Sequence, residues 1–140
     1  GLGFGNYTCW KIIMSLKESP FLDKKIIIEN ESAFAIYDGF PISKGHSLII
    51  PKRIVSSIFD LNDEEYNQIF LLLKNVRKIL KDKFNPDGFN IGVNNGKYAG
   101  QTIDHAHVHI IPRYKDDIKD PRGGVRNIIP DKSGYLKWKL

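Results

Sequence analysis

Residues 102–111 read Thr-Ile-Asp-His-Ala-His-Val-His-Ile-Ile, and three of the chain's four histidines stand here at alternate positions: His105, His107 and His109. Successive side chains of an extended strand point to opposite faces of a sheet. An extended conformation therefore gathers the three imidazoles on one face, with small and branched apolar residues on the other. A helix would scatter them around its axis. The alternation predicts a strand over 102–111, stopped by Pro112, with a row of imidazoles on one side.

Apolar runs and turn residues divide the rest of the chain into short elements. Four further strands are expected, at 24–29, 33–37, 46–50 and 89–93. The three polar residues 30–32 separate the first two of these strands and predict a hairpin. The short apolar stretch Cys9–Leu16 predicts one or two helical turns that end before Ser19-Pro20.

One long helix is expected between Asn62 and Phe84. Asn62 can cap its first turn, and Glu65 stands three residues later in a capping-box arrangement. Apolar residues then recur at spacings of three and four, as on the buried side of a helix: Tyr66, Ile69, Leu72, Leu73, Val76, Ile79, Leu80 and Phe84. The turn residues 85–88 end it.

Length and composition indicate one globular domain. The chain has 140 residues, of which 41% are hydrophobic and 26% charged. Residues 1–8 are expected to be a flexible tail or a remnant of cloning, and 9–140 a single domain with an extension after 113. The single cysteine, Cys9, excludes an intramolecular disulfide and a cysteine-rich zinc site.

The charge and hydropathy of the chain bear on its partners. The net charge of +5 is compatible with nucleic acid, an acidic membrane surface or a small phosphorylated substrate. The sequence holds no interleaved basic and aromatic motif of the kind that binds nucleic acid, and no apolar run of membrane-spanning length. We expect no nucleic-acid or membrane partner, and a cytoplasmic location.

The histidine row carries the candidate chemistry. Imidazole titrates at a pKa of about 6.5, so it can act as nucleophile, base, acid or cation in neutral water. Crowding several rings discourages simultaneous protonation, so that one ring can attack while another faces a phosphate. A zinc site is the alternative, because histidines two apart on a strand can share one metal, with His46 or Asp104 completing it. The spacing leaves both readings open.

The segment before the row favours phosphate chemistry. Residues 94–102 read Asn-Asn-Gly-Lys-Tyr-Ala-Gly-Gln-Thr. They offer amides, a hydroxyl, a cation and flexible backbone, all of which suit the oxygens of a polyphosphate. Joined to the histidine row, this loop predicts a site for a phosphorylated ligand.

These motifs together resemble the histidine triad family. Residues 100–113 (Gly-Gln-Thr-Ile-Asp-His-Ala-His-Val-His-Ile-Ile-Pro-Arg) look like its signature of three histidines alternating with apolar residues. The likeness extends to 44–51, similar to the family's glycine-histidine strand, and to Asn94 and Asn95. It covers about 26–113. It implies an α+β fold: an antiparallel sheet of about five strands, one long helix and a short N-terminal helix. It also implies a homodimer, formed through the long helix and an edge strand, with a continuous sheet of ten strands.

The resemblance assigns roles to the histidines. By similarity, His107 attacks the α-phosphorus of a nucleotide and forms a transient nucleotidyl-histidine, which water resolves to release a nucleoside monophosphate. His109 would bind the phosphoryl oxygens and assist the leaving group. His105 and His46 would orient and polarise the row from behind. This chemistry needs no metal or other cofactor in the family, and we expect none here.

The resemblance also assigns substrate contacts. Four positions match residues that contact phosphates: Asn94, Gly100, Gln101 and Thr102. Asp38, eight residues before His46, matches an acidic or amide residue on the ribose hydroxyls, and Ile36 would line the base pocket. The expected substrate is a purine nucleotide or a dinucleoside polyphosphate. The alternatives are an adenosine phosphoramidase or nucleotidyl transferase of the same family, or a nucleotide-binding protein with weak catalysis.

Three features differ from known branches of the family. Many bacterial relatives carry a paired-cysteine zinc site, which the lone Cys9 cannot rebuild. The fragile-histidine-triad branch has glutamine where this chain has Asn94. Residues 120–126 (Asp-Pro-Arg-Gly-Gly-Val-Arg) resemble the C-terminal stretch of bacterial members described as dinucleoside polyphosphate hydrolases. Arg122 and Arg126 are therefore candidates to hold distal phosphates, with a solvated loop as the alternative.

Overall fold

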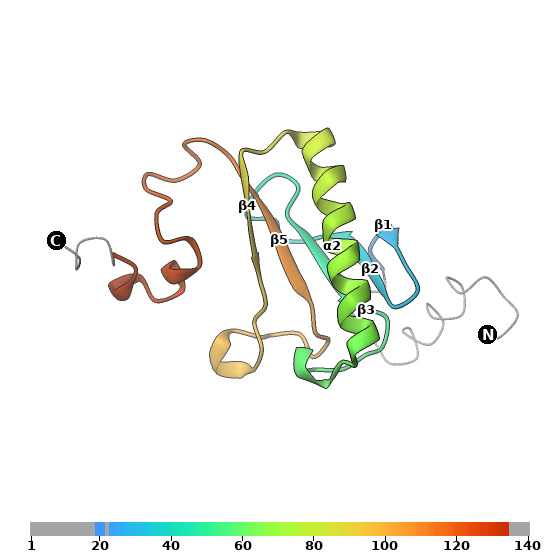
Figure 1. The fold of residues 1–140 in the computed structure, drawn as a ribbon. Coiled ribbons are helices and arrows are strands. Elements are labelled where there is room, and N and C mark those ends of the chain that lie inside the picture. The colour runs from blue at the N-terminus through green and yellow to red at the C-terminus, as the bar shows by residue number, and fades with distance from the viewer. Residues whose placement is uncertain (1–18, 22, 135–140) are drawn as a thin grey trace, which may run out of the picture.

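The computed structural model describes residues 19–21 and 23–134. Five strands form one antiparallel sheet in the order β1-β2-β3-β5-β4, and one long helix, α2, lies across it (Figure 1). The strands are β1 (Ile26–Glu29), β2 (Ala33–Tyr37), β3 (Ser47–Pro51), β4 (Gly88–Gly92) and β5 (Val108–Arg113), and the helix is α2 (Asp63–Phe84). Short 3-10 helices are η1 (Ile58–Asp60), η2 (Lys97–Ala99), η3 (Gly124–Ile128) and η4 (Pro130–Lys132).

These elements confirm the expected α+β class and most of the expected boundaries. The strand 33–37 is observed as predicted, and those at 24–29, 46–50 and 89–93 have ends shifted by one or two residues. The expected turns over Cys9–Leu16 and the tail 1–8 lie outside the described residues. In the part of the chain that the structure describes, none of the helices combines the length and the hydropathy that crossing a bilayer requires.

The capping box predicted for α2 is present. Asn62 Oδ1 accepts a hydrogen bond from the Glu65 backbone N–H at 2.8 Å, and Glu65 Oε1 accepts one from the Asn62 N–H at 3.0 Å. Asn85 ends the helix in the left-handed conformation at φ 50°. Paired donors and acceptors at the first turn fix where the helix starts, and therefore which of its faces meets the sheet.

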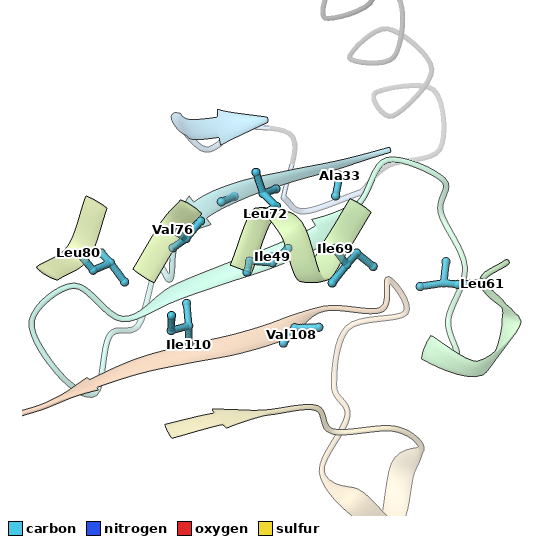
Figure 2. Close-up of a cluster of buried hydrophobic side chains, with 10 residues drawn as sticks. Ala33, Ile49, Leu61, Ile69, Leu72, Val76, Leu80, Val108 and Ile110 are labelled. Atoms are coloured by element: carbon cyan, nitrogen blue, oxygen red, sulfur yellow. The ribbon is translucent and has the colours of Figure 1, made fainter. Parts of the chain in front are cut away.

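The main core lies between α2 and the sheet. Figure 2 shows the buried helix side chains Ile69, Leu72, Val76 and Leu80 directed at the strands. In β2 the residues that belong to this core are small, Ala33 and Ala35, which lets the helix approach the sheet closely. The alternate residues of β2, together with neighbours from β3 and with Phe21, form a second buried cluster: Phe21, Phe34, Ile36, Leu48 and Ile50. The strands β2 and β3 are thus buried on both faces.

The predicted strand 102–111 is wrong at both ends. The strand β5 begins at Val108 and runs through Pro112 to Arg113, so His105 and His107 precede it. A strand needs neighbours, and the partners of β5 start only at Val108, where Ile49 pairs with it. The backbone before Val108 bonds instead to a loop, since the Ala106 N–H donates to the Val55 carbonyl at 2.7 Å. Pro112 fits inside β5, opposite Phe89 of the edge strand β4.

The turn that leads into His46 depends on a glycine. Gly45 has φ +90°, a conformation that side-chain-bearing residues rarely adopt. A Cβ atom at this position would lie 2.8 Å from Phe84 Cδ2 and 3.2 Å from Pro112 Cγ. The close approach joins the start of β3 to the end of α2, and so fixes where the chain enters His46.

We predict that Gly45→Ala lowers the free energy of unfolding by about 1–3 kcal/mol, because the new methyl group meets Phe84 and the backbone is held at positive φ. Urea unfolding followed by circular dichroism measures this change. The matched control is Gly88→Ala, whose Cβ would have no neighbour within 4 Å. Equal stability of the Gly45→Ala protein and wild type would contradict the proposed role of this turn.

Candidate active site

The strand register aligns one row of residues across the sheet. Leu48 of β3 pairs with Ile36 of β2 on one side and with His109 of β5 on the other, and His109 pairs with Gly92 of β4. Directly opposed residues of antiparallel strands share a face. Ile36 and Leu48 belong to the cluster on the face away from α2, so His109 lies on that face, in the middle of the sheet.

His107 has a defined proton arrangement. Its Nδ1 lies 2.8 Å from the His105 carbonyl oxygen. A carbonyl can only accept, so Nδ1 carries the proton and Nε2 keeps its lone pair. The ring packs edge-on against Phe21 at 5.2 Å and against His109 at 5.1 Å between centroids. A ring held in this way can act as a nucleophile through Nε2.

The proton of His109 lies on the other ring nitrogen from that of His107. The Ile42 backbone N–H donates to His46 Nδ1 at 3.2 Å, so the proton of the neutral His46 ring lies on Nε2. That proton is donated to His109 Nδ1 at 2.9 Å. The proton of a neutral His109 ring must then lie on Nε2. His109 can therefore donate a hydrogen bond to a ligand oxygen beside the His107 lone pair.

His105 acts from behind these two rings. It is buried, its Nε2 donates to the Pro51 carbonyl at 2.7 Å, and its Nδ1 accepts from the Ser19 hydroxyl at 2.9 Å. Both ring nitrogens are occupied, and the ring is not among the residues that line the cavity described below. His105 is a positioning residue, since its own carbonyl oxygen orients His107.

Burial keeps the rings of His46, His105 and His109 neutral. Loss of hydration lowers the pKa of His105 to about 4, and nearby His107 acts in the same direction. Burial lowers the pKa of His109 to about 4 as well, with His107 and His46 adding to the effect. Burial also lowers the pKa of His46, against the opposing charge of Asp38. The hydrogen bonds assigned above to His46, His105 and His109, which require neutral rings, are therefore the ones expected at neutral pH.

We predict that His105 makes folding pH-dependent in acid. Its folded pKa of about 4 lies below the unfolded value of 6.5, so its contribution to stability is full above pH 6.5 and is lost as the pH falls toward 4. Urea unfolding at about pH 7.5 and about pH 5 should show a smaller decline for His105→Gln than for wild type. Imidazole NMR titration gives the pKa directly. Identical declines in the two proteins would contradict this assignment.

A cavity of about 330 Å³ opens beside His107 and His109. Eight residues proposed from the sequence line it together: Ile36, Asp38, Asn94, Gly100, Gln101, Thr102, His107 and His109. They come from β2, the turn after it, the loop that follows β4 and the start of β5. The remaining two proposed residues, His105 and His46, lie behind the lining and hold His107 and His109.

Gln101 has a structural task in this lining. Its Nε2 donates to the Ser56 carbonyl at 2.7 Å and to the Ile103 carbonyl at 3.0 Å, and its Oε1 accepts from the Gly96 N–H at 2.8 Å. The Gln101 side chain therefore links Gly96 to Ile103 within the loop and ties the loop to Ser56. Gly100, at φ +94°, ends η2 just before Gln101. The loop presents its backbone, with Asn94 and Thr102, to the cavity.

The sequence reasoning missed seven residues that complete the lining of this cavity, most of them apolar. Three precede β1, namely Pro20, Phe21 and Lys24, and four lie beside or within the segments already named, namely Gly39, Phe40, Leu48 and Ile103. Phe21 contacts the rings of both His105 and His107, and Ser19 bonds to His105. No local pattern marks these residues, since Ser19-Pro20 only suggested the end of a helix.

Asp38 lies close to the paired rings. Its Oδ2 is 3.4 Å from His46 Nε2 and 3.9 Å from His109 Nδ1. Among the described residues, these three form a group that could hold a metal, with all ligand atoms within 4.8 Å of one another. This group contains His46, one of the two residues expected to complete such a site, but only one histidine of the row, and Asp104 Oδ1 instead accepts from Ser56 Oγ. A metal here would have to displace the proton that His46 and His109 share.

Comparison with known proteins gives the same family as the motif. The HIT domain model matches residues 20–116, so this chain belongs to the histidine triad (HIT) family. It is 38% identical over 96 residues to bis(5'-adenosyl)-triphosphatase of Dictyostelium discoideum, covering 69% of this chain and 64% of that protein. It is 41% identical over 80 residues to the asymmetrical bis(5'-nucleosyl)-tetraphosphatase of Schizosaccharomyces pombe, covering 57% and 44%. The aligned part thus spans less than two thirds of either relative.

The fold is also that of solved family members. A crystal structure of a HIT family protein from Bacillus subtilis superposes with a TM-score of 0.66 at 28% identity, covering 96% of this chain and 94% of that one. The expected family fold is confirmed by this agreement.

Proposed function

We propose that this protein is a nucleotide hydrolase that cleaves at the α-phosphorus through a covalent bond to His107. The observation that carries the proposal is the pair of fixed tautomers: a lone pair on His107 Nε2 beside a proton on His109 Nε2. The first suits attack on phosphorus, and the second suits stabilisation of the negative oxygens around it.

In the first step, His107 Nε2 attacks the α-phosphorus and the bond from phosphorus to the bridging oxygen breaks. The electron pair of that bond leaves with the departing phosphate, and His109 donates a hydrogen bond to the oxygens that gain charge. The nucleotidylated His107 ring is then cationic. Its Nδ1–H bond to the His105 carbonyl at 2.8 Å stabilises that charge as it develops.

In the second step, water attacks the same phosphorus. The bond between phosphorus and nitrogen breaks, its electron pair returns to His107 Nε2, and the proton lost by the water passes to solvent. The product is a nucleoside monophosphate. Two displacements replace one difficult attack by water.

The cavity lining supports a purine nucleoside as the group that is held. Four apolar side chains suit a base: Phe21, Ile36, Leu48 and Ile103. Asp38 suits the ribose hydroxyls, since its Oδ1 already accepts from the Phe40 N–H at 2.8 Å and is held in place. The relatives named as a triphosphatase and a tetraphosphatase favour a dinucleoside polyphosphate as substrate. A phosphoramidase or transferase would use the same His107, whereas a protein that only binds nucleotide has no use for a nucleophile that lines the cavity.

We predict that His107→Asn binds nucleotide but loses hydrolysis of diadenosine triphosphate by roughly 10³-fold or more, because the lone pair of the asparagine amide nitrogen is delocalised and cannot attack phosphorus. Product release is measured by mass spectrometry over a panel of nucleotides. Rapid acid-free quenching of wild type with substrate radiolabelled at the α-phosphorus should leave label on the protein, and the variant should show none.

Circular dichroism and nucleotide binding by calorimetry serve as controls that His107→Asn is folded and still holds its ligand. Undiminished hydrolysis by the folded variant would refute the proposal. So would hydrolysis by wild type with no labelled protein under conditions that slow the second step.

We propose a homodimer joined through β4 and α2. β4 is an edge strand of the sheet and, among the described strands, pairs only with β5, while α2 packs over β1, β2, β3 and β5 (Figure 1). Apolar side chains are exposed on both elements, with Phe70 at 61%, Leu71 at 54% and Ile91 at 42% of full exposure. Pairing two copies of β4 would give a sheet of ten strands. The cytoplasmic location stays a prediction.

We predict that wild type has the mass of a dimer in solution, about twice the 16.0 kDa of one chain, and that Phe70→Glu has the mass of a single chain. The substitution places a charge in an apolar interface. Multi-angle light scattering measures the mass. Phe59→Glu, on exposed η1, is the control and should stay dimeric. A wild-type mass of a single chain would remove the basis for this interface.

A further inference from the structure

A second cavity lies on the far side of His109. Its volume is about 590 Å³, and it shares four lining residues with the first cavity: Asp38, Phe40, Asn94 and His109. His107 lines the first cavity but not the second. The two cavities therefore meet at His109, and the candidate nucleophile faces one of them.

The segment after Arg113 builds the outer wall of this second cavity. Gly123 and Gly124 both have positive φ, 93° and 50°, and reverse the chain so that η3 lies beside β4 (Figure 1). A Cβ on Gly124 would come within 3.3 Å of Asn90 Nδ2. Asn90 is itself fixed, since Arg113 Nη1 donates to its Oδ1 at 2.7 Å. The glycine pair thus seats η3 against a rigid part of the sheet.

The lining chemistry selects the kind of group that fits. Most of the wall is aliphatic or aromatic, including Phe40, Ile42, Val125 and Ile128, and Asn90 and Asn127 add amide groups. Its described lining holds no lysine or arginine, and it includes the carboxylate of Asp38. A bare phosphate would meet that carboxylate without a compensating cation. A flat apolar ring with hydrogen-bonding edges suits the cavity better, because its faces can pack on the apolar side chains and its edges can bond to the amide groups.

The direction of the reaction points to the same cavity. In a displacement at phosphorus, the attacking and leaving atoms lie roughly in line on opposite sides. A phosphorus attacked by His107 from within the first cavity therefore releases its leaving group away from His107. Because His109 borders both cavities, a leaving group that departs past His109 would enter the second cavity, toward η3.

We propose that this second cavity, walled by Val125 and Ile128 of η3, binds the nucleoside carried by the leaving group. The inference rests on the proposed function and extends it: the C-terminal segment makes the enzyme selective for substrates that carry a nucleoside at each end. Arg122, which the sequence suggested for distal phosphates, pairs with Asp120 at 2.9 Å. Neither Arg122 nor Arg126 is among the described residues lining the two cavities. The apolar residues of η3 therefore carry the selectivity.

The test compares two substrates that share the nucleotidyl half and differ in the leaving group, diadenosine triphosphate and adenosine 5′-phosphoramidate. We expect the double variant Val125→Ala/Ile128→Ala to lower kcat/KM for diadenosine triphosphate by about tenfold, since a lost apolar contact of this size changes discrimination by that order. The value for the phosphoramidate should stay within about twofold, because ammonia has no group to place there. Ile129→Ala is the matched control, being exposed on the same segment but outside the lining.

Other outcomes have distinct meanings. An equal loss for both substrates would overturn the inference, since η3 would then act on the shared nucleotidyl half. No loss for either would also overturn it. If that result came with a change of mass in solution, a second copy of the chain would be the occupant of the cavity. Failure of wild type to cleave either substrate, with no labelled protein, would instead refute the proposed function itself.

Discussion

The hydrogen bond from His107 Nδ1 to the His105 carbonyl is the interaction on which the site depends. It assigns the proton to one nitrogen and leaves the other with its lone pair. The carbonyl is in position because the His105 side chain is itself held, between Pro51 and Ser19. A buried ring with both nitrogens satisfied therefore anchors the backbone that orients its neighbour. The same burial lowers the pKa of His105 and keeps the ring neutral.

The second pair of rings completes the arrangement from the sheet. His109 stands on β5, and His46 leads into β3, so the antiparallel pairing of β3 and β5 brings them together. The backbone N–H of Ile42 sets the tautomer of His46, which in turn sets that of His109. Two series of hydrogen bonds thus set the proton positions in the site. One, through His105, leaves a lone pair on His107, and the other, through His46, leaves a donor on His109. Two cavities then meet at His109.

Local sequence determined a large part of this protein. The periodicity and capping box between Asn62 and Phe84 defined α2, since both depend only on residues a turn apart. The hairpin of β1 and β2 followed from polar residues between two apolar runs. The triad signature with Lys44–Pro51 indicated the family, and the resemblance named eight of the residues that line the first cavity. Six of these eight lie between Asn94 and His109, close enough in sequence for a local motif to mark them.

Tertiary structure decided what the spacing could not. The alternation at 102–111 predicted one strand, but a strand needs neighbours. His105 instead bonds to Pro51 at the end of β3, and Ala106 bonds to Val55 in the loop that follows. Phe21 and Ser19 reach the histidines from more than eighty residues away in sequence, and η3 reaches β4 only through the turn at Gly123 and Gly124. The proton positions were decided last of all. A tautomer depends on which acceptor faces each nitrogen, and the folded chain alone brings those acceptors there.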